Sequence, residues 1–158
     1  MLIILEGPDG AGKTTLAQQL SMSTGYPVQH RSKPKTEEEK QQMFLEYEQM
    51  CMSRENIIVD RCWYSEMVYG KVMRDQSYIS QDQMLALERN IMMIGGGGII
   101  VHCTDKVDTL WDRLKDRGED YITDIHKLAE ITFGYEMLMH QQRHWLPVFR
   151  YAISKKMY

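Results

Sequence analysis

A short glycine-rich segment near the start of the chain carries residue types that bind phosphate. It fits the pattern G-x-x-x-x-G-K-[ST], with Gly7, Gly12, Lys13 and Thr14 in the fixed positions. Glycines let backbone N–H groups turn toward phosphate oxygens, the lysine reaches the β- and γ-phosphates, and the hydroxyl is a ligand for Mg²⁺. We therefore expect a site for the phosphates of ATP and for Mg²⁺. The residues expected to form it are Gly7, Pro8, Asp9, Gly10, Ala11, Gly12, Lys13, Thr14 and Thr15.

The residues on either side of this phosphate loop (residues 7–15) must place it between a strand and a helix. Residues 1–5 are a continuous apolar run, as in a buried parallel strand, and residues 13–22 have the pattern of a helix. A helix that begins at the loop adds the positive end of its dipole to the phosphate site. This context favours a phosphate site over a chance match in a glycine-rich turn. We expect the loop to be exposed until a ligand binds.

The composition is that of a single domain, residues 1–158, with a sizeable core. With 19 Lys and Arg against 22 Asp and Glu, the net charge is −3, so no overall positive field favours nucleic acid. The first apolar run is too short to span a membrane. Cys51, Cys62 and Cys103 have no metal-ligand spacing, and their odd number without a signal segment indicates a reducing cytoplasm.

Helices and strands alternate along the rest of the chain. Two capping boxes, at Thr36 and at Ser80, predict where helices begin. This alternation predicts an α/β P-loop fold of three layers, a five-stranded parallel sheet with helices on both faces. Ligands of such sheets bind at the carboxyl ends of the strands. We expect further strands at 27–30, 56–60, 98–103 and 148–153, and helices at 36–53, 80–94, 107–114 and 123–144, the last capped by Thr123.

Asp60 ends a second long apolar strand, and Arg61 follows it directly. An aspartate in this position can hold Mg²⁺ through water, and a helix or turn cap is the alternative. An arginine beside a phosphate loop can hold a second phosphate bidentately, and a surface salt bridge is the alternative. We interpret Thr14 and Asp60 as metal ligands and Arg61 as a phosphate ligand.

Segments 5–9 and 60–70 together resemble the thymidylate kinase family of nucleoside monophosphate kinases, most of all the small deoxynucleotide kinases encoded by bacteriophages. The resemblance covers nearly the whole chain, because the phosphate loop, the Asp-Arg pair and an arginine-rich lid follow in the family's order. It implies that Asp9 hydrogen-bonds the 3′-hydroxyl of the acceptor sugar, that Arg61 holds the acceptor phosphate, and that Tyr69 excludes a ribose 2′-hydroxyl. The acceptor site that it implies comprises Asp9, Arg31, Arg61, Ser65, Glu66 and Tyr69.

Residues 113–123 resemble the lid of that family. Arg113 and Arg117 are four residues apart, so both project from one side of a helix end, and Gly118 lets the segment move. In that family a catalytic arginine lies in the phosphate loop or in the lid, and the loop position here is Gly10. The resemblance therefore implies that the lid supplies it. The catalytic residues that follow are Lys13, Arg61, Arg113 and Arg117.

The segment between residues 34 and 56 is shorter than in that family. The family's base-stacking phenylalanine and base-reading arginine therefore have no fixed counterparts in it. Phe44, Tyr47 and Arg54 are the candidates, and core packing is the alternative for the two aromatic residues. For Arg31, which precedes this segment, a solvated loop charge is an equal alternative to a role in the acceptor site.

The resemblance implies Mg²⁺-dependent transfer of the γ-phosphate of ATP to a deoxynucleoside monophosphate, with thymidylate as the first candidate. The implied partners are small-molecule nucleotides, without nucleic acid or membrane, and a homodimer is allowed. One alternative is a deoxynucleoside kinase with Glu6 as the base on a sugar hydroxyl. Another is a GTP-binding switch, because residues 105–108 faintly match the guanine-reading pattern N-K-x-D. A helix cap explains Asp105 better.

Overall fold

A computed structural model describes residues 1–31, 34–119 and 121–155. All strand pairs are parallel, and the sheet has the order β2-β3-β1-β4-β5. The expected α/β fold with a five-stranded parallel sheet is confirmed. The elements are β1 (Leu2–Glu6), α1 (Lys13–Thr24), β2 (Val28–His30), α2 (Glu37–Met52), β3 (Ile57–Asp60), α3 (Trp63–Arg74), α4 (Gln81–Met93), β4 (Gly98–Cys103), α5 (Val107–Asp116), α6 (Ile125–His140), β5 (Val148–Tyr151) and the 3₁₀ helix η1 (Ile153–Lys155).

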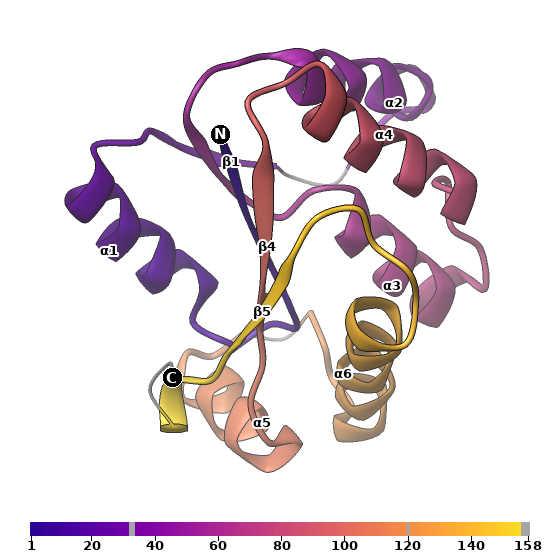
Figure 1. Ribbon diagram of the computed structural model, residues 1–158. Helices are drawn as coiled ribbons and strands as arrows, with labels where there is room; N and C mark the ends of the chain where they lie inside the picture. The colour runs from indigo at the N-terminus through magenta and orange to yellow at the C-terminus, as the bar shows by residue number, and fades with distance from the viewer. Residues whose placement is uncertain (32–33, 120, 156–158) are drawn as a thin grey trace.

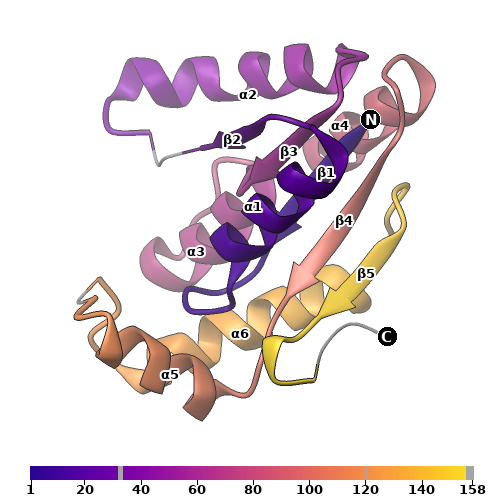
Figure 2. The ribbon, with the colours of Figure 1, turned by 90° about the vertical axis from the view of Figure 1, so that its left-hand side faces the viewer.

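The helices lie on both faces of the sheet. Figure 1 shows α1 on one side and α3, α4 and α6 on the other. In Figure 2 the strands run toward the end of the molecule where α5 lies, and β5 is at the edge of the sheet. Because all strands are parallel, their carboxyl ends meet at this end, and the loops that follow them can form one site.

Strands β1 and β3 are buried along their whole length, as their apolar sequences predict. Leu5 of β1 is aligned with Asp60 of β3, and Glu6 is aligned with His102 of β4. This register brings the phosphate loop next to the Asp60-Arg61 pair, because each follows one of two neighbouring strands. Both expected capping boxes, at Thr36 and at Ser80, are present.

Three boundaries differ from the sequence prediction. Helix α6 is capped by Asp124 rather than Thr123 and ends at His140 rather than 144. The chain turns after His140 because His144 bonds the buried carboxylate of Glu88, with Nδ1 and Oε1 2.7 Å apart. Strand β5 is also shorter than expected and is followed by η1.

Helix α3 is not among the helices expected from the sequence, and Gly70, a residue type that disfavours helices, lies within it. The carboxylate of Glu6 supports its first turn from strand β1, as described below.

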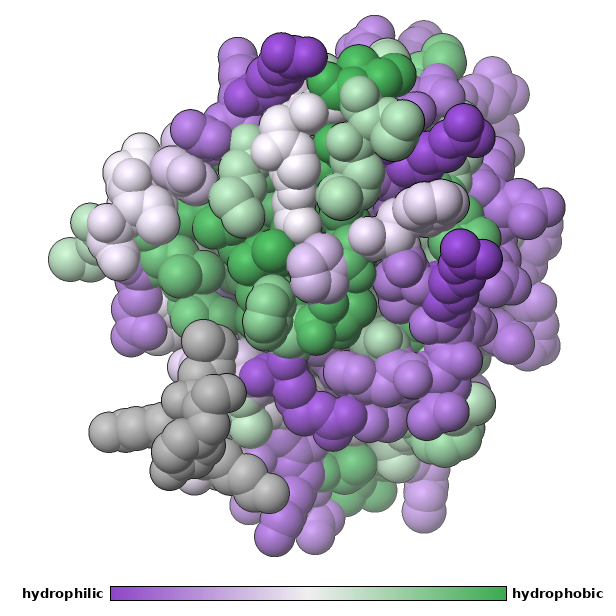
Figure 3. Space-filling view, in the orientation of Figure 1, coloured by the Kyte–Doolittle hydropathy of each residue, from purple (hydrophilic) through white to green (hydrophobic). Residues whose placement is uncertain are grey.

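One face of the molecule has a broad apolar area. Figure 3 shows apolar residues gathered over the region of β4 and β5, between more polar margins. Phe149 of the edge strand β5 has a relative exposure of 51%. Within the part of the chain that the structure describes, every helix is too short or too polar to cross a membrane.

Candidate phosphoryl-transfer site

Three glycines of the phosphate loop are required by its geometry. Gly10 and Gly12 have φ angles of 80° and 78°, in the left-handed region that L side chains rarely adopt. A Cβ atom at Gly7 would lie 1.8 Å from the carbonyl oxygen of Cys103, so strand β4 leaves room there only for glycine. The loop therefore takes the tight path that directs backbone N–H groups toward a phosphate.

Lys13 is buried, with a relative exposure of 6%, so the expectation of an exposed loop does not hold at this residue. Its Nζ atom donates a hydrogen bond of 2.7 Å to the carbonyl oxygen of Pro8. Burial and the nearby charge of Arg61 lower the pKa of Lys13 to about 8. The lysine is thus held inside the loop, where it spans from the start of α1 to Pro8 before any ligand is bound.

Thr14 and Asp60, the expected metal ligands, lie next to each other. The Thr14 hydroxyl donates to Oδ2 of Asp60 across 3.1 Å, and Nδ1 of His30 lies 3.0 Å from the same oxygen. A hydroxyl beside a carboxylate at a phosphate loop fits Mg²⁺, which prefers oxygen ligands and keeps part of its water shell. His30 was not among the site residues expected from the sequence. It lies at the end of β2, aligned with Asp60, so the rule that sites form at strand ends could have indicated it.

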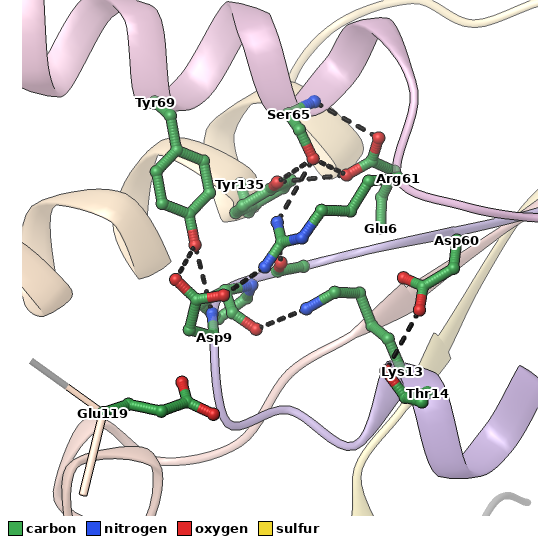
Figure 4. Close-up of polar contacts among 12 residues, drawn as sticks. Glu6, Asp9, Lys13, Thr14, Asp60, Arg61, Ser65, Tyr69, Glu119 and Tyr135 are labelled. Atoms are coloured by element: carbon green, nitrogen blue, oxygen red, sulfur yellow. Dashed lines mark hydrogen bonds and ion pairs between the residues drawn. The ribbon is translucent and has the colours of Figure 1, made fainter. Parts of the chain in front are cut away.

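Arg61, Asp9 and Tyr69 form a connected group, shown in Figure 4. The guanidinium of Arg61 is ion-paired with the carboxylate of Asp9 and donates to the carbonyl oxygen of Gly7. The Tyr69 hydroxyl donates to Oδ2 of Asp9 at 2.9 Å and accepts a bond from the Asp9 backbone N–H at 3.1 Å. Arg61 has a φ angle of 70°, a strained conformation for a side chain of this size.

Glu6 is fully buried and bonds the first turn of α3. Its carboxylate accepts hydrogen bonds from the backbone N–H groups of Cys62 and Ser65, at 2.7 and 3.2 Å. It also accepts bonds from the hydroxyls of Ser65 and Tyr135, at 2.6 and 3.0 Å, as Figure 4 shows. A carboxylate at a helix N-terminus satisfies N–H groups that have no partner within the helix. Glu6 thereby fixes the segment that carries Arg61.

Two adjoining cavities meet at the carboxyl ends of the strands. One, of about 370 Å³, contains the phosphate loop and is called the phosphate cavity here. The other, of about 700 Å³, lies against α2 and α3 and is called the side cavity. The residues that line both are Asp9, Arg31, Arg61 and Glu119. The phosphate cavity is further lined by Gly10, Gly12, Lys13, Thr14, Thr15, His30, Asp60 and Arg117, and the side cavity by Pro34, Lys35, Met43, Tyr47, Cys62, Ser65, Glu66, Tyr69, Arg74 and Tyr121.

The expected acceptor residues are brought together around the side cavity. Ser65, Glu66 and Tyr69 project from α3, and Arg31 reaches both cavities while it pairs with Glu46 at 3.0 Å. Of the candidates for base contacts, Tyr47 lines the side cavity. Phe44 packs against the core, and Arg54 donates to the carbonyl oxygen of Ile94. The alternative of a core role therefore holds for Phe44, and Tyr47 is also buried in the core while it lines the cavity.

Several residues that line the side cavity were not expected from the sequence. The reason is distance along the chain, because only the folded chain brings these residues together. The missed residues are Pro34, Lys35, Met43, Cys62, Arg74, Glu119 and Tyr121.

The two lid arginines have different surroundings. Arg113 donates to the Gly10 carbonyl oxygen at 3.1 Å and pairs with Asp105 at 3.0 Å, whereas Arg117 lines the phosphate cavity. The expected cap role of Asp105 was wrong. Helix α5 has Lys106 as its N-cap without a side-chain bond, and Asp105 instead bonds Arg113 and Ser154. Ser32 and Lys33, which follow Arg31, and Asp120 of the expected lid lie outside the described residues.

The parallel sheet, the phosphate loop and the paired Thr14 and Asp60 are features of P-loop enzymes that act on nucleotides. The comparison with protein families agrees, since residues 1–120 match the family model described as polyphosphate kinase 2 (PPK2). The chain belongs to the polyphosphate kinase 2 family. It is 31% identical over 132 residues to the SPbeta prophage-derived uncharacterized protein YorR of Bacillus subtilis (strain 168), covering 82% of this chain and 78% of YorR.

Solved structures agree with this fold. A crystal structure of YorR in complex with phosphorylated GDP superposes with a TM-score of 0.81, 28% identity, and coverage of 98% of this chain and 87% of YorR. Deoxyadenosine kinase from M. mycoides with bound dATP has a TM-score of 0.66, 20% identity and coverage of 96% and 91%, and shares the fold alone. These findings support nucleotide kinase-type phosphoryl transfer, while membership of the thymidylate kinase family stays a prediction.

Proposed function

We propose that this chain transfers the γ-phosphate of ATP to a deoxynucleoside monophosphate in a Mg²⁺-dependent reaction. One observation carries the proposal: a cavity with a phosphate loop adjoins a second cavity, and Arg61 and Asp9 lie at their boundary. Phosphoryl transfer needs two phosphates aligned and their charge neutralised, and it needs little further chemistry from the protein. A donor in the phosphate cavity and an acceptor in the side cavity would place their phosphates at that boundary.

The residues of the boundary have distinct roles in this proposal. Lys13 binds the donor phosphates, Arg61 binds the acceptor phosphate, and Arg117 reaches the transferring group from the lid. Thr14 and Asp60 would hold Mg²⁺, and that ion when bound neutralises charge on the β- and γ-phosphates. Asp9 leaves Arg61 when the acceptor phosphate enters and bonds the 3′-hydroxyl of the sugar.

The base of the acceptor is proposed as thymine, with guanine as the second candidate. Thymine follows from the resemblance of residues 60–70 to the thymidylate kinase family. Guanine is favoured by the phosphorylated GDP bound to YorR. A panel of dTMP, dGMP, dAMP, dCMP and GMP with ATP and Mg²⁺ tests both. Turnover of no monophosphate above that of a Lys13→Ala variant would refute the proposed function.

The deoxynucleoside kinase alternative requires a base near a sugar hydroxyl. Glu6 was the candidate, but its carboxylate already accepts four hydrogen bonds. The described residues that line the two cavities do not include Glu6. These contacts favour a monophosphate acceptor over a nucleoside. An assay that compares thymidine with dTMP at equal concentration separates the two reactions.

A second donor follows from the family description, which names polyphosphate. Cations of Lys13, Arg31, Arg61 and Arg117 line the phosphate cavity, and such a set can bind a phosphate chain that carries no base. We keep ATP as the proposed donor because the loop and the Thr14–Asp60 pair suit a Mg²⁺-bound nucleotide. Parallel assays with ATP and with inorganic polyphosphate, at equal acceptor concentration, decide between the donors.

A further inference from the structure

A cluster of metal-binding side chains lies between strand β4 and helix α6. Nδ1 of His102 on β4 is 2.9 Å from Nε2 of His140 on α6. Glu136 lies one helical turn before His140, so both side chains are on the same side of α6. One ligand atom from each of these three residues lies within 4.8 Å of the other two. The cluster shares no residue with the linings of the two cavities.

Packing alone does not explain why a histidine, and not an apolar residue, is present at position 102. The residue is fully buried, and among the described residues its Nε2 atom is one of two buried side-chain nitrogens without a hydrogen-bond partner. The ring stacks on Tyr135 with centroids 6.1 Å apart, a contact that an apolar ring would also make. A buried ring nitrogen without a partner costs free energy, so an apolar residue would serve packing better. The single polar contact of His102 points at His140, inside the cluster.

Burial favours the neutral form of both histidines, which is the form that binds metals. Burial, His140 and Arg150 lower the pKa of His102 to about 3, with Lys13 adding to the effect. Partial burial and Arg150 also lower the pKa of His140, against the opposing charge of Glu136. Neutral imidazole nitrogens and a carboxylate are common ligands of Zn²⁺, at about 2.0–2.2 Å. Tetrahedral geometry at that length separates two nitrogens by about 3.3 Å, so the rings need to part by only a few tenths of an ångström.

We propose that His102, Glu136 and His140 form a binding site for a divalent transition-metal ion of the Zn²⁺ type, separate from the nucleotide site. Two imidazoles and a carboxylate favour such an ion over Mg²⁺, which prefers oxygen ligands. Water completes the coordination, because Glu136 and His140 are only partly buried. The bound ion joins α6 to β4, and it should therefore stabilise the folded protein by mass action.

Arg150 allows metal binding at this site to be distinguished from binding at ordinary surface histidines. This residue of β5 is ion-paired with Glu136 when no metal is bound. Its guanidinium competes with the metal for the carboxylate and repels a divalent cation. Replacing Arg150 with Gln should consequently strengthen metal binding, although it removes an existing ion pair.

The test uses the full-length protein freed of metal by chelation, without nucleotide and with Mg²⁺ in excess. Co²⁺ is titrated while its visible absorption is recorded, and Zn²⁺ binding is measured by calorimetry and by the shift in Tm. We expect one equivalent of each ion to bind. We also expect Glu136→Gln and His140→Gln each to weaken binding by at least about tenfold, and Arg150→Gln to strengthen it by about threefold or more.

Two control variants separate this cluster from other histidines. His30 lies beside Asp60 and Thr14, and His126 is an exposed residue of α6. His30→Gln and His126→Gln should leave the affinity and the Co²⁺ spectrum unchanged. The proposal is overturned if the wild type binds no ion more tightly than about 100 µM. It is also overturned if His30→Gln or His126→Gln weakens binding as much as His140→Gln, or if Arg150→Gln weakens it.

Discussion

The guanidinium of Arg61 is ion-paired with the carboxylate of Asp9 at the point where the phosphate cavity meets the side cavity. One partner belongs to the phosphate loop and the other follows strand β3, so the pair joins two segments that are 52 residues apart. A phosphate that enters from the side cavity would take the place of the Asp9 carboxylate. In the free protein, Arg61 therefore already lies at the proposed acceptor-phosphate site, and the Asp9 carboxylate neutralises its charge.

Arg61→Ala should lower kcat/KM for the monophosphate by about 10- to 100-fold, because a charge-assisted bidentate contact is lost. Affinity for ATP should change little. Arg61→Lys should recover only a small part of the loss, since an ammonium group cannot form two parallel hydrogen bonds. Initial rates over a range of acceptor and donor concentrations provide the measurement. A variant impaired only in ATP binding would mean that the donor and acceptor sides are reversed.

Nucleotide binding should take up protons near pH 8. Burial and Arg61 depress the pKa of Lys13 to about 8 in the free protein, and bound phosphates would raise it again. At pH 8 about half of the Lys13 side chains are neutral, so ATP binding should take up about half a proton, falling toward zero at pH 6.5. Calorimetry in buffers of different ionisation enthalpy measures this uptake. In a Lys13→Met control the pH-dependent uptake should vanish, and its persistence would assign it to another group.

Arg117→Ala should slow the chemical step by on the order of 10³-fold, because an arginine that reaches the transferring phosphoryl group has that effect in comparable enzymes. Arg113→Ala is the matched comparison. Arg113 is bonded to Gly10 and Asp105, so its loss should loosen the phosphate loop and raise the KM for ATP more than it lowers kcat. Single-turnover kinetics on both variants distinguishes these effects. If Arg113→Ala is the slower of the two in chemistry, the two roles must be exchanged.

A buried charged pair should make stability depend on pH. Nε2 of His144 faces the carbonyl oxygen of Leu138 and Nδ1 faces the carboxylate of Glu88, both at 2.7 Å. A hydrogen on each ring nitrogen would satisfy both acceptors, so these contacts favour the positively charged imidazole. Burial opposes that charge, but the bonds to Glu88 and Leu138 outweigh it and raise the pKa of His144.

Since the folded pKa of His144 is raised, its contribution to stability is complete below the unfolded value of about 6.5 and is lost as pH rises through the folded pKa. Lys13, His102 and His140 have lowered pKa values and act in the opposite direction. The informative quantity is therefore the difference in unfolding free energy between the wild type and His144→Gln, from urea titrations at pH 6 to 9. This difference should shrink as pH rises. A constant difference would show that the histidine is neutral.

Most of the helices and strands could be predicted because they depend on local sequence, and helix α3 is the exception. Apolar runs define β1, β3 and β4, and the boxes at Thr36 and Ser80 define the start of two helices. The end of α6 could not be predicted in this way. The residues after His140 would also support a helix, and the chain leaves it to reach Glu88, which lies 56 residues earlier than His144.

The site was predictable where a motif or a strand end marks it. The phosphate loop and the Asp60-Arg61 pair are adjacent in space because their strands are neighbours. Burial of Lys13 and the contacts of Glu6 depend on partners distant in sequence, such as Tyr135, and no local pattern reveals them. Glu119 and Tyr121 line the side cavity for the same reason, since the segment after α5 is brought there only by the fold.

The reciprocal hydrogen bonds between Asp9 and Tyr69 have an energetic consequence for ligands. Asp9 belongs to the phosphate loop, Tyr69 belongs to the wall of the side cavity, and the two bonds of 3.1 and 2.9 Å make them one unit. A ligand that immobilises this unit from one side lowers the entropy cost of binding on the other side. Thermodynamic linkage then requires that donor and acceptor change each other's affinity by the same factor.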